Sequence, residues 1–86
     1  MSKRLKNRVC IVTGSGQGMG RASAIEMARE GGKVVVADLN EVTGKETVSM
    51  IEAEGNTATF IHVDLRDSAS IKSLMDKAAE TYGGID

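Results

Sequence analysis

Residues 9–20 read VCIVTGSGQGMG, an apolar run followed by glycine at every second position. The apolar part, residues 9–12, is short and mostly β-branched, which is typical of a strand buried on both faces of a parallel sheet. Each glycine costs roughly 0.5–1 kcal/mol relative to alanine in regular structure, so the repeat indicates a backbone with left-handed angles or one that is approached closely. Glycines between such a strand and a helix leave backbone N–H groups and the positive helix end open to a phosphate. The stretch therefore predicts an anion-binding turn.

The spacing of the glycines distinguishes between kinds of phosphate-binding turn. A nucleoside triphosphatase loop, G-x-x-x-x-G-K-[ST], requires a Lys-Ser or Lys-Thr pair that does not follow these glycines. The common dinucleotide motif G-x-G-x-x-G fails as well, because its third position falls on Met19 when the motif starts at Gly14. The pattern that fits is G-x-x-x-G-x-G, formed by Gly14, Gly18 and Gly20.

The sequence beyond the glycines alternates predicted helices and strands. A helix over residues 19–30 ends at a Gly-Gly pair, and a buried strand follows over residues 33–38. Asn40 caps a second helix, which ends at Gly55, and a third strand spans residues 57–63.

The clearest amphipathic helix comes last. Asp67 or Ser68 caps it. Apolar residues recur along one of its faces at helical spacing: Ile71, Leu74, Met75, Ala78, Ala79 and Tyr82. Residues 85–86 look like the start of a fourth strand. The alternation predicts an α/β fold, a doubly wound parallel sheet with strand order 3-2-1, in which three strand-helix units are present and the remainder of the sheet is missing.

Several single residues are interpreted as structural. Met27, Met50 and Met75 stand in predicted helices, where methionine commonly fills gaps in the core. Cys10 is a small core side chain rather than a reactive thiol. His62 shares a strand face with a nearby carboxylate, but two ligands are few for a metal, so a packed or hydrogen-bonded histidine is favoured and no metal site is predicted.

Asp38 ends the second predicted strand, 18 residues beyond Gly20. A carboxylate there can accept hydrogen bonds from both hydroxyls of an adenosine ribose, each worth about 1.5–3 kcal/mol. A 2′-phosphate would meet like charge instead, at about 4 kcal/mol for unit charges 4 Å apart near a protein surface. Asp38 therefore predicts NAD over NADP, with simple capping of the following turn as the alternative.

Two further residues have open roles. Asp64 closes the third predicted strand at the same edge of the sheet, where it could accept from an adenine amino group or cap the turn that follows. Arg21, in the first turn of the first helix, could reach a phosphate or face water.

Composition excludes several classes of protein. The 86 residues suffice for one folding unit, and 11 basic against 12 acidic residues give a net charge of −1. We therefore expect no nucleic acid partner, which the two aromatic residues also argue against. No apolar run has the length of a membrane span, and the single cysteine suits a reducing compartment, so a cytoplasmic protein without a membrane association is expected.

Four features together resemble the amino-terminal part of the short-chain dehydrogenase/reductase family. They are Thr13-Gly14-x-x-x-Gly18-x-Gly20, Asp38, the Val63-Asp64-Leu65 turn and the Tyr-Gly-Gly-Ile-Asp ending. The resemblance covers almost the whole chain. It implies a Rossmann fold in which residues 1–86 form the amino-terminal part of one NAD(P)-binding domain. It also implies reversible hydride transfer between a small-molecule secondary alcohol and a ketone, NAD as cofactor, and a homo-oligomer, a dimer or tetramer.

The resemblance also assigns the cofactor-binding residues. Asp38 holds the ribose and Asp64 the adenine. The full set consists of the glycine turn and the two strand ends: Gly14, Ser15, Gln17, Gly18, Met19, Gly20, Asp38, Leu39, Asp64 and Leu65. Members that prefer NADP often carry a basic residue just before the second glycine, where this chain has Gln17.

The catalytic part of the family is not found in these residues. The family's serine and Tyr-x-x-x-Lys pair lie beyond residue 86, and the position four residues after Tyr82 is Asp86. A tyrosine near its ordinary pKa of about 10 cannot act alone as a general acid or base at neutral pH. We therefore expect no catalytic residue here, and no turnover by these residues alone. Two other functions stay open: a dinucleotide-binding module without catalysis, or an interaction remnant.

Overall fold

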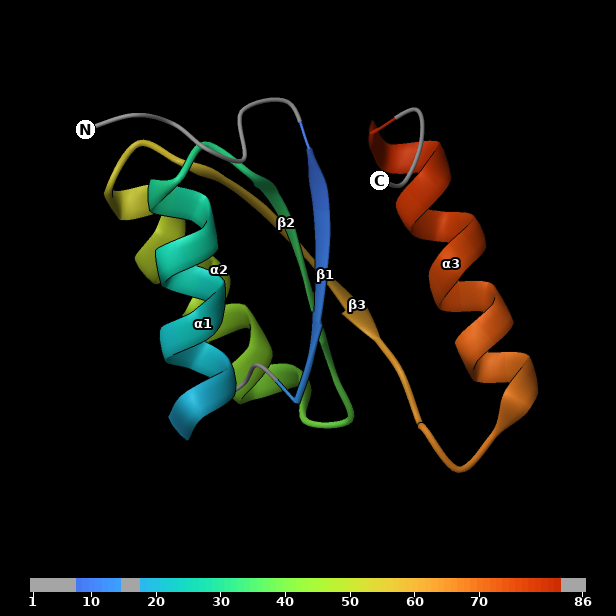
Figure 1. Ribbon diagram of the computed structural model, residues 1–86. Coiled ribbons are helices and arrows are strands. Elements are labelled where there is room, and N and C mark those ends of the chain that lie inside the picture. Colours follow the sequence, from blue (N-terminus) through green and yellow to red (C-terminus); the bar gives the residue numbers. More distant parts are fainter. Residues whose placement is uncertain (1–7, 15–17, 83–86) are drawn as a thin grey trace.

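In the computed structural model, which describes residues 8–14 and 18–82, helices cover both faces of a three-stranded sheet (Figure 1). The elements in chain order are β1 (Val9–Thr13), α1 (Gly18–Arg29), β2 (Lys33–Asp38), α2 (Glu41–Ala53), β3 (Thr57–His62) and α3 (Ser68–Tyr82). All strand pairs are parallel and β2 is central, so the order β1-β2-β3 is the predicted order read from the other edge. The predicted α/β fold is confirmed.

The central strand separates two apolar clusters. Residues 34–37 of β2 are fully buried, because helices lie on both faces of this parallel sheet. Val34 and Val36 pack with residues of α1 and α2, whereas Val35 and Ala37 pack with residues of β3 and α3. The period of two along the strand thus places α1 and α2 on one face and α3 on the other, as Figure 1 shows.

A glycine brings α2 close to β3. Gly44 is buried in α2, and a Cβ atom built on it would overlap the ring of Phe60 in β3. Nothing in the sequence indicates this contact, because a glycine inside a helix carries no local signal of what lies opposite. Gly44 allows the ring to lie directly against the helix backbone.

The prediction that the methionines fill the core is correct for one of them. Met27 packs against the cluster on the α1 and α2 face, whereas Met50 and Met75 are 44% and 45% exposed. The buried stripes are narrower than the periodicity suggested. Each of these exposed methionines adjoins a buried residue, Ile51 in α2 and Leu74 in α3, and therefore lies about 100° around the helix from it.

The apolar face predicted for α3 is also narrower than expected. Leu74 and Ala78 are buried, but Ile71 is 37% exposed. Cys10 in β1 is half-buried. Over the described part of the chain, no helix is both long and apolar enough to cross a bilayer.

Candidate cofactor site

A cleft of about 250 Å³ lies at the carboxyl ends of the strands. Its lining comes from the end of β1 and from the turns that follow β2 and β3: Gly14, Asp38, Leu39, Val63, Asp64, Leu65 and Arg66. Carboxyl ends of parallel strands meet at one edge of a sheet, and ligands of open α/β folds bind outside that edge. The cleft is therefore where this fold class binds its ligands.

The glycine turn begins in a left-handed backbone conformation. Gly14 and Gly18 have φ angles of 65° and 64°, which side chains rarely adopt. A Cβ atom built on either residue would meet nothing within 4 Å. The need for glycine is thus conformational at both positions, because a methyl group there would contact no other described residue. The backbone N–H of Gly14 donates to Ala37 O at 2.9 Å, which ties the turn to the end of β2.

The start of α1 completes the described part of this turn. Gly18 is the first residue of α1, so the end of the helix that carries the unpaired N–H groups follows the turn directly. Met19 is 88% exposed, and Gly20 is half-buried within the helix. Of the predicted site residues, Ser15 and Gln17 lie outside the described residues.

The turn between β2 and α2 carries Asp38. Its Oδ1 accepts from the backbone N–H of Asn40 at 3.0 Å. Asn40 caps α2 as predicted, because its side-chain oxygen accepts from Thr43 N at 3.2 Å. Leu39 is 54% exposed and lines the cleft beside the carboxylate. Asp38 therefore supports the turn, as the alternative interpretation proposed, and also faces the cleft.

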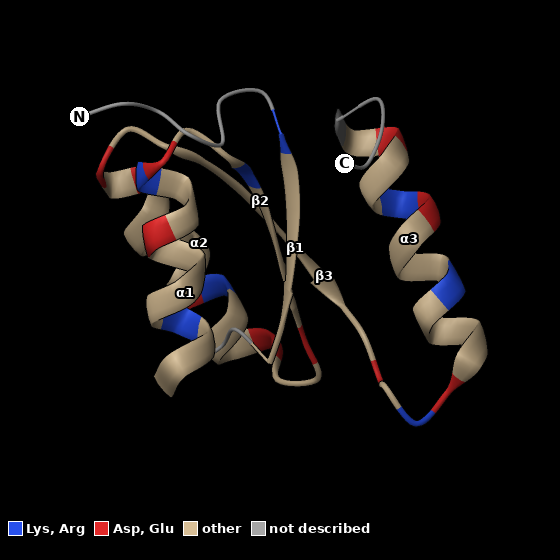
Figure 2. Cartoon of the chain, viewed as in Figure 1, with Lys and Arg blue, Asp and Glu red and all other residues tan. Residues whose placement is uncertain are grey.

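The turn between β3 and α3 carries Asp64, and here an arginine holds the carboxylate. Arg66 donates from its Nε to Oδ1 at 3.0 Å and from its Nη2 to Oδ2 at 3.1 Å, and its backbone N–H also donates to Oδ1. The side-chain hydrogen bond to Arg66 is the largest cause that lowers the pKa of Asp64, from 3.8 to about 2. Figure 2 shows this basic segment between acidic ones after β3. Asp64 is therefore ionised throughout the physiological pH range.

The structure brings together the predicted residues of both strand ends. Asp38, Leu39, Asp64 and Leu65 line one cleft with Gly14. Two lining residues, Val63 and Arg66, were not predicted as site residues. The signal for Arg66 was present in the sequence, since it stands two residues after a strand-end carboxylate, where side chain and backbone can both reach that carboxylate.

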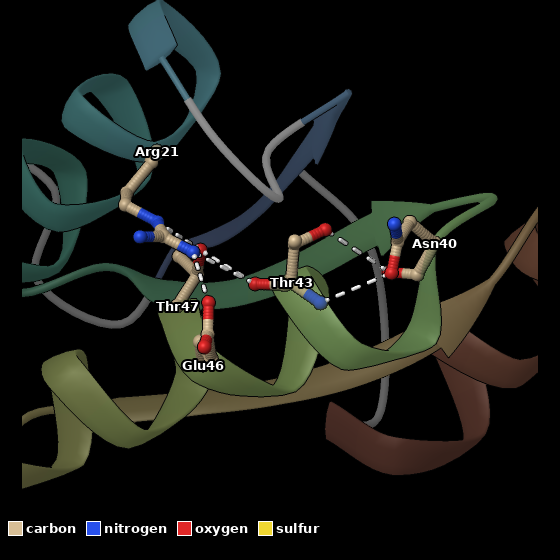
Figure 3. A network of polar contacts seen from close by, with 5 residues as sticks. All are labelled: Arg21, Asn40, Thr43, Glu46 and Thr47. Atoms are coloured by element: carbon tan, nitrogen blue, oxygen red, sulfur yellow. Dashed lines mark hydrogen bonds and ion pairs between the residues drawn. The ribbon is translucent and has the colours of Figure 1, made fainter.

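The structure gives Arg21 a partner that neither sequence interpretation included. Its side chain turns to α2, where Nε donates to Thr47 Oγ1 at 2.9 Å and Nη2 donates to Thr43 O and Glu46 Oε1, each at 3.1 Å (Figure 3). Because the partner side chains come from another helix, no local pattern in the sequence could have indicated them.

Of the two interpretations of His62, packed or hydrogen-bonded, packing is wrong, since its side chain is exposed at the end of β3. It follows Ile61, which is buried, so the alternation of the strand turns His62 to the other face, beyond the start of α2. Among the described residues, no group of three or more His, Cys, Asp or Glu side chains could hold a metal ion.

Comparison with known proteins identifies relatives of this chain. Residues 8–86 match the family model of short chain dehydrogenases. The 2,5-dichloro-2,5-cyclohexadiene-1,4-diol dehydrogenase LinX of Sphingobium indicum is 42% identical over 85 residues, 99% of this chain and 34% of that protein. A 7alpha-hydroxysteroid dehydrogenase of Clostridium sardiniense is 39% identical over 84 residues, 98% of this chain and 32% of the relative.

A solved structure agrees with these relatives. The crystal structure of a hydroxysteroid dehydrogenase from Escherichia coli matches with a TM-score of 0.95 at 32% identity, over 98% of this chain and 36% of that one. The chain thus spans about a third of the length of each of these proteins. The family model and these relatives confirm the resemblance seen in the sequence, and the chain belongs to the short-chain dehydrogenase family.

Proposed function

We propose that the whole protein carrying this chain is an NAD-dependent short-chain dehydrogenase, which transfers hydride between a secondary alcohol and the nicotinamide cofactor. Residues 1–86 are the amino-terminal part of its single NAD(P)-binding domain and supply cofactor binding but no catalytic residue. The observation that carries the proposal is the cleft at the strand ends, which Asp38 lines together with Gly14, the first residue of the glycine turn.

The described residues fit a dinucleotide. The open space before Gly14 and Gly18, together with the start of α1, suits a pyrophosphate, which backbone N–H groups and the helix dipole would stabilise. Asp38 accepts the ribose hydroxyls, and the exposed side chains of Leu39 and Leu65 offer apolar surface to the adenine ring. When bound, the nicotinamide group accepts or donates the hydride.

The preference for NAD follows from the charge of Asp38. A charged acceptor contributes about 1.5–3 kcal/mol for each ribose hydrogen bond. The same charge repels a 2′-phosphate by about 4 kcal/mol per pair of unit charges at 4 Å. Met19 and Gly20 continue the turn without a basic side chain that would offset this repulsion.

Three further properties belong to this proposal. The whole protein acts on a small-molecule alcohol or ketone, assembles as a dimer or tetramer, and resides in the cytoplasm. The two relatives described above are named for a cyclohexadiene diol and a hydroxysteroid, both of which carry a secondary alcohol.

Calorimetric titration of the whole protein with NAD and with NADP tests the proposal. We expect NAD to bind at least tenfold more tightly than NADP. Asp38→Ala weakens NAD binding by more than about 100-fold, because two ribose hydrogen bonds of about 1.5–3 kcal/mol each are lost. Asp76→Ala, an exposed carboxylate on α3, is the matched control and leaves both affinities unchanged.

Two results would contradict the proposal. Equal or tighter binding of NADP would show that Asp38 does not face the ribose. NAD binding without any alcohol-dependent formation of NADH by the whole protein would favour a binding module over a dehydrogenase.

A further inference from the structure

Two arginine contacts join α1 to α2, one near each end of the helix pair. Arg21, in the first turn of α1, binds Thr43, Glu46 and Thr47 of α2. Arg29, the last residue of α1, binds the Glu54 carboxylate at 2.9 and 2.7 Å. The first contact is next to the glycine turn, whereas the second is at the far end of both helices.

The contact made by Arg21 is the more buried of the two. The Arg21 side chain is 21% exposed, against 51% for Arg29. Its partner Thr47 is fully buried, and the Thr47 hydroxyl accepts from Arg21 while donating to Thr43 O at 3.2 Å. Removing the partner of a buried donor lowers stability more than removing the partner of an exposed donor, because water cannot replace the lost hydrogen bond. The arginine fork is thus fixed in one geometry.

From Arg21 a continuous series of hydrogen bonds leads to the cleft. The Arg21 guanidinium donates to Thr43 O, and Thr43 N donates to the Asn40 side chain (Figure 3). Asn40 N in turn donates to Asp38 Oδ1. Each link lies in the first turn of α2 or in the turn before it. The position of the Asp38 carboxylate is therefore connected to the first turn of α1, which follows the glycines.

We infer that Arg21 is a positioning residue for the cofactor site, which sets the Asp38 carboxylate at the distance from the glycine turn that one dinucleotide spans. This inference rests on the proposed function. A dinucleotide binds through its pyrophosphate at the start of α1 and through its ribose at Asp38, so its affinity depends on how the two elements are spaced. A displacement of about 1 Å between groups that bind one ligand is enough to lose much of the interaction.

The Arg29 contact provides a matched control. It also joins an arginine of α1 to a glutamate, Glu54 at the C-cap of α2, at 2.9 and 2.7 Å, but it is remote from the cleft. If an arginine between α1 and α2 mattered only for stability, both contacts would affect the site equally. Comparing Arg21→Ala with Arg29→Ala in the whole protein separates positioning from general helix packing.

The experiment measures the dissociation constants of NAD and NADP, with the melting temperature recorded for each variant. We expect Arg21→Ala to raise the NAD constant about tenfold and the NADP constant less, so that the preference for NAD falls. Arg29→Ala changes both constants by less than about twofold. Arg21→Lys, which keeps the charge but not the fork, recovers part of the affinity.

Thr47→Val keeps the test informative if Arg21→Ala does not fold. It preserves the shape of the buried side chain and removes only the hydroxyl that accepts from Arg21. We expect it to raise the NAD constant about threefold. Ser49→Val, a β-branched replacement at an exposed position of the same helix, is its control and leaves the constant unchanged.

A double-mutant cycle with Asp38→Ala identifies the route of the effect. In the Asp38→Ala background, Arg21→Ala should change the NAD constant by less than about twofold, because the carboxylate that it positions is gone. Equal effects of Arg21→Ala in both backgrounds, or equal effects of Arg21→Ala and Arg29→Ala, overturn the inference alone. Failure of the unaltered protein to bind NAD or NADP overturns the proposed function and this inference with it.

Discussion

The turns that follow β2 and β3 begin alike and then diverge. In each, an aspartate at or just after the strand end is followed by an exposed leucine, and the backbone N–H two residues after the aspartate donates to its Oδ1 at 3.0 Å. The residue that makes this bond is Asn40 in the first turn and Arg66 in the second. Asn40 uses its side chain to cap α2, whereas Arg66 uses its side chain to bind both oxygens of Asp64.

The difference between Asn40 and Arg66 gives the two carboxylates different surroundings. The charge of Asp64 is balanced by a guanidinium within hydrogen-bond distance, so a ligand must compete with Arg66 for its oxygens. The corresponding residue of the first turn, Asn40, has a neutral side chain that caps α2, and Asp38 lines the cleft. We therefore propose that Asp38 recognises the ribose, while Asp64, held by Arg66, forms the adjacent wall of the cleft.

Within this comparison, the largest effect is expected on NAD affinity, when the arginine of the turn after β3 is introduced at the matching position of the turn after β2. In Asn40→Arg, a guanidinium placed as in Arg66 would bind Asp38 and withdraw it from the ribose. We expect at least a tenfold loss of NAD affinity, or about 1.4 kcal/mol. Asn40→Ala is the control, since it removes the cap, worth about 1 kcal/mol of stability, without adding the charge. Equal NAD affinities of the two variants would contradict the comparison.

A smaller effect is expected when a larger side chain pushes α2 away from β3. Gly44→Ala places a methyl group against the Phe60 ring, and overpacking of this kind costs about 1–3 kcal/mol. The better helix propensity of alanine offsets about 1 kcal/mol of this. We expect a net loss of roughly 1 kcal/mol in the free energy of unfolding, measured by urea denaturation of the whole protein.

Two further variants test that explanation. Adding Phe60→Leu to Gly44→Ala should recover part of the loss, because the smaller side chain leaves room for the methyl group. Ser49→Ala, on the exposed side of α2, should not destabilise the protein. A Gly44→Ala protein as stable as the unaltered one would show that the helix and β3 can separate freely.

The smallest effect concerns the titration of Asp64. In the unaltered protein its pKa is about 2, below the ordinary 3.8, chiefly because of the hydrogen bond from Arg66. Since the folded-state pKa is lowered, the contribution of Asp64 to stability is present above about pH 4 and is lost as the pH falls toward 2. In Arg66→Ala the pKa should rise toward 3.8, followed by NMR of the carboxyl carbon. A titration unchanged by the substitution would show that Arg66 does not hold Asp64.

The sequence could predict the fold, and could predict a site at the carboxyl-end edge of the sheet, because both follow from local patterns. Apolar runs with period two or 3.6 predicted the elements, and parallel strands necessarily bring their carboxyl ends together, which placed Asp38 and Asp64 at one edge. The contacts between helices could not be predicted in the same way. Arg21 meets α2, and Gly44 meets Phe60, only because of how closely particular elements pack.

The exposed methionines show the same limit. Periodicity predicts which side of a helix is apolar, but the width of the buried stripe depends on the elements that cover it. Met50 and Met75 each adjoin a buried residue but remain about half exposed, outside the surface that the neighbouring elements cover. Local pattern thus predicted the direction of each helix face, and the tertiary contacts decided its extent.

A crystal structure of the whole protein with NAD tests the central claim most directly. The account predicts that both ribose hydroxyls lie within hydrogen-bond distance of the Asp38 carboxylate, that the pyrophosphate lies before Gly14 and Gly18, and that Arg66 still binds Asp64. A ribose bound away from Asp38, or an adenosine outside the cleft between the two turns, would contradict it.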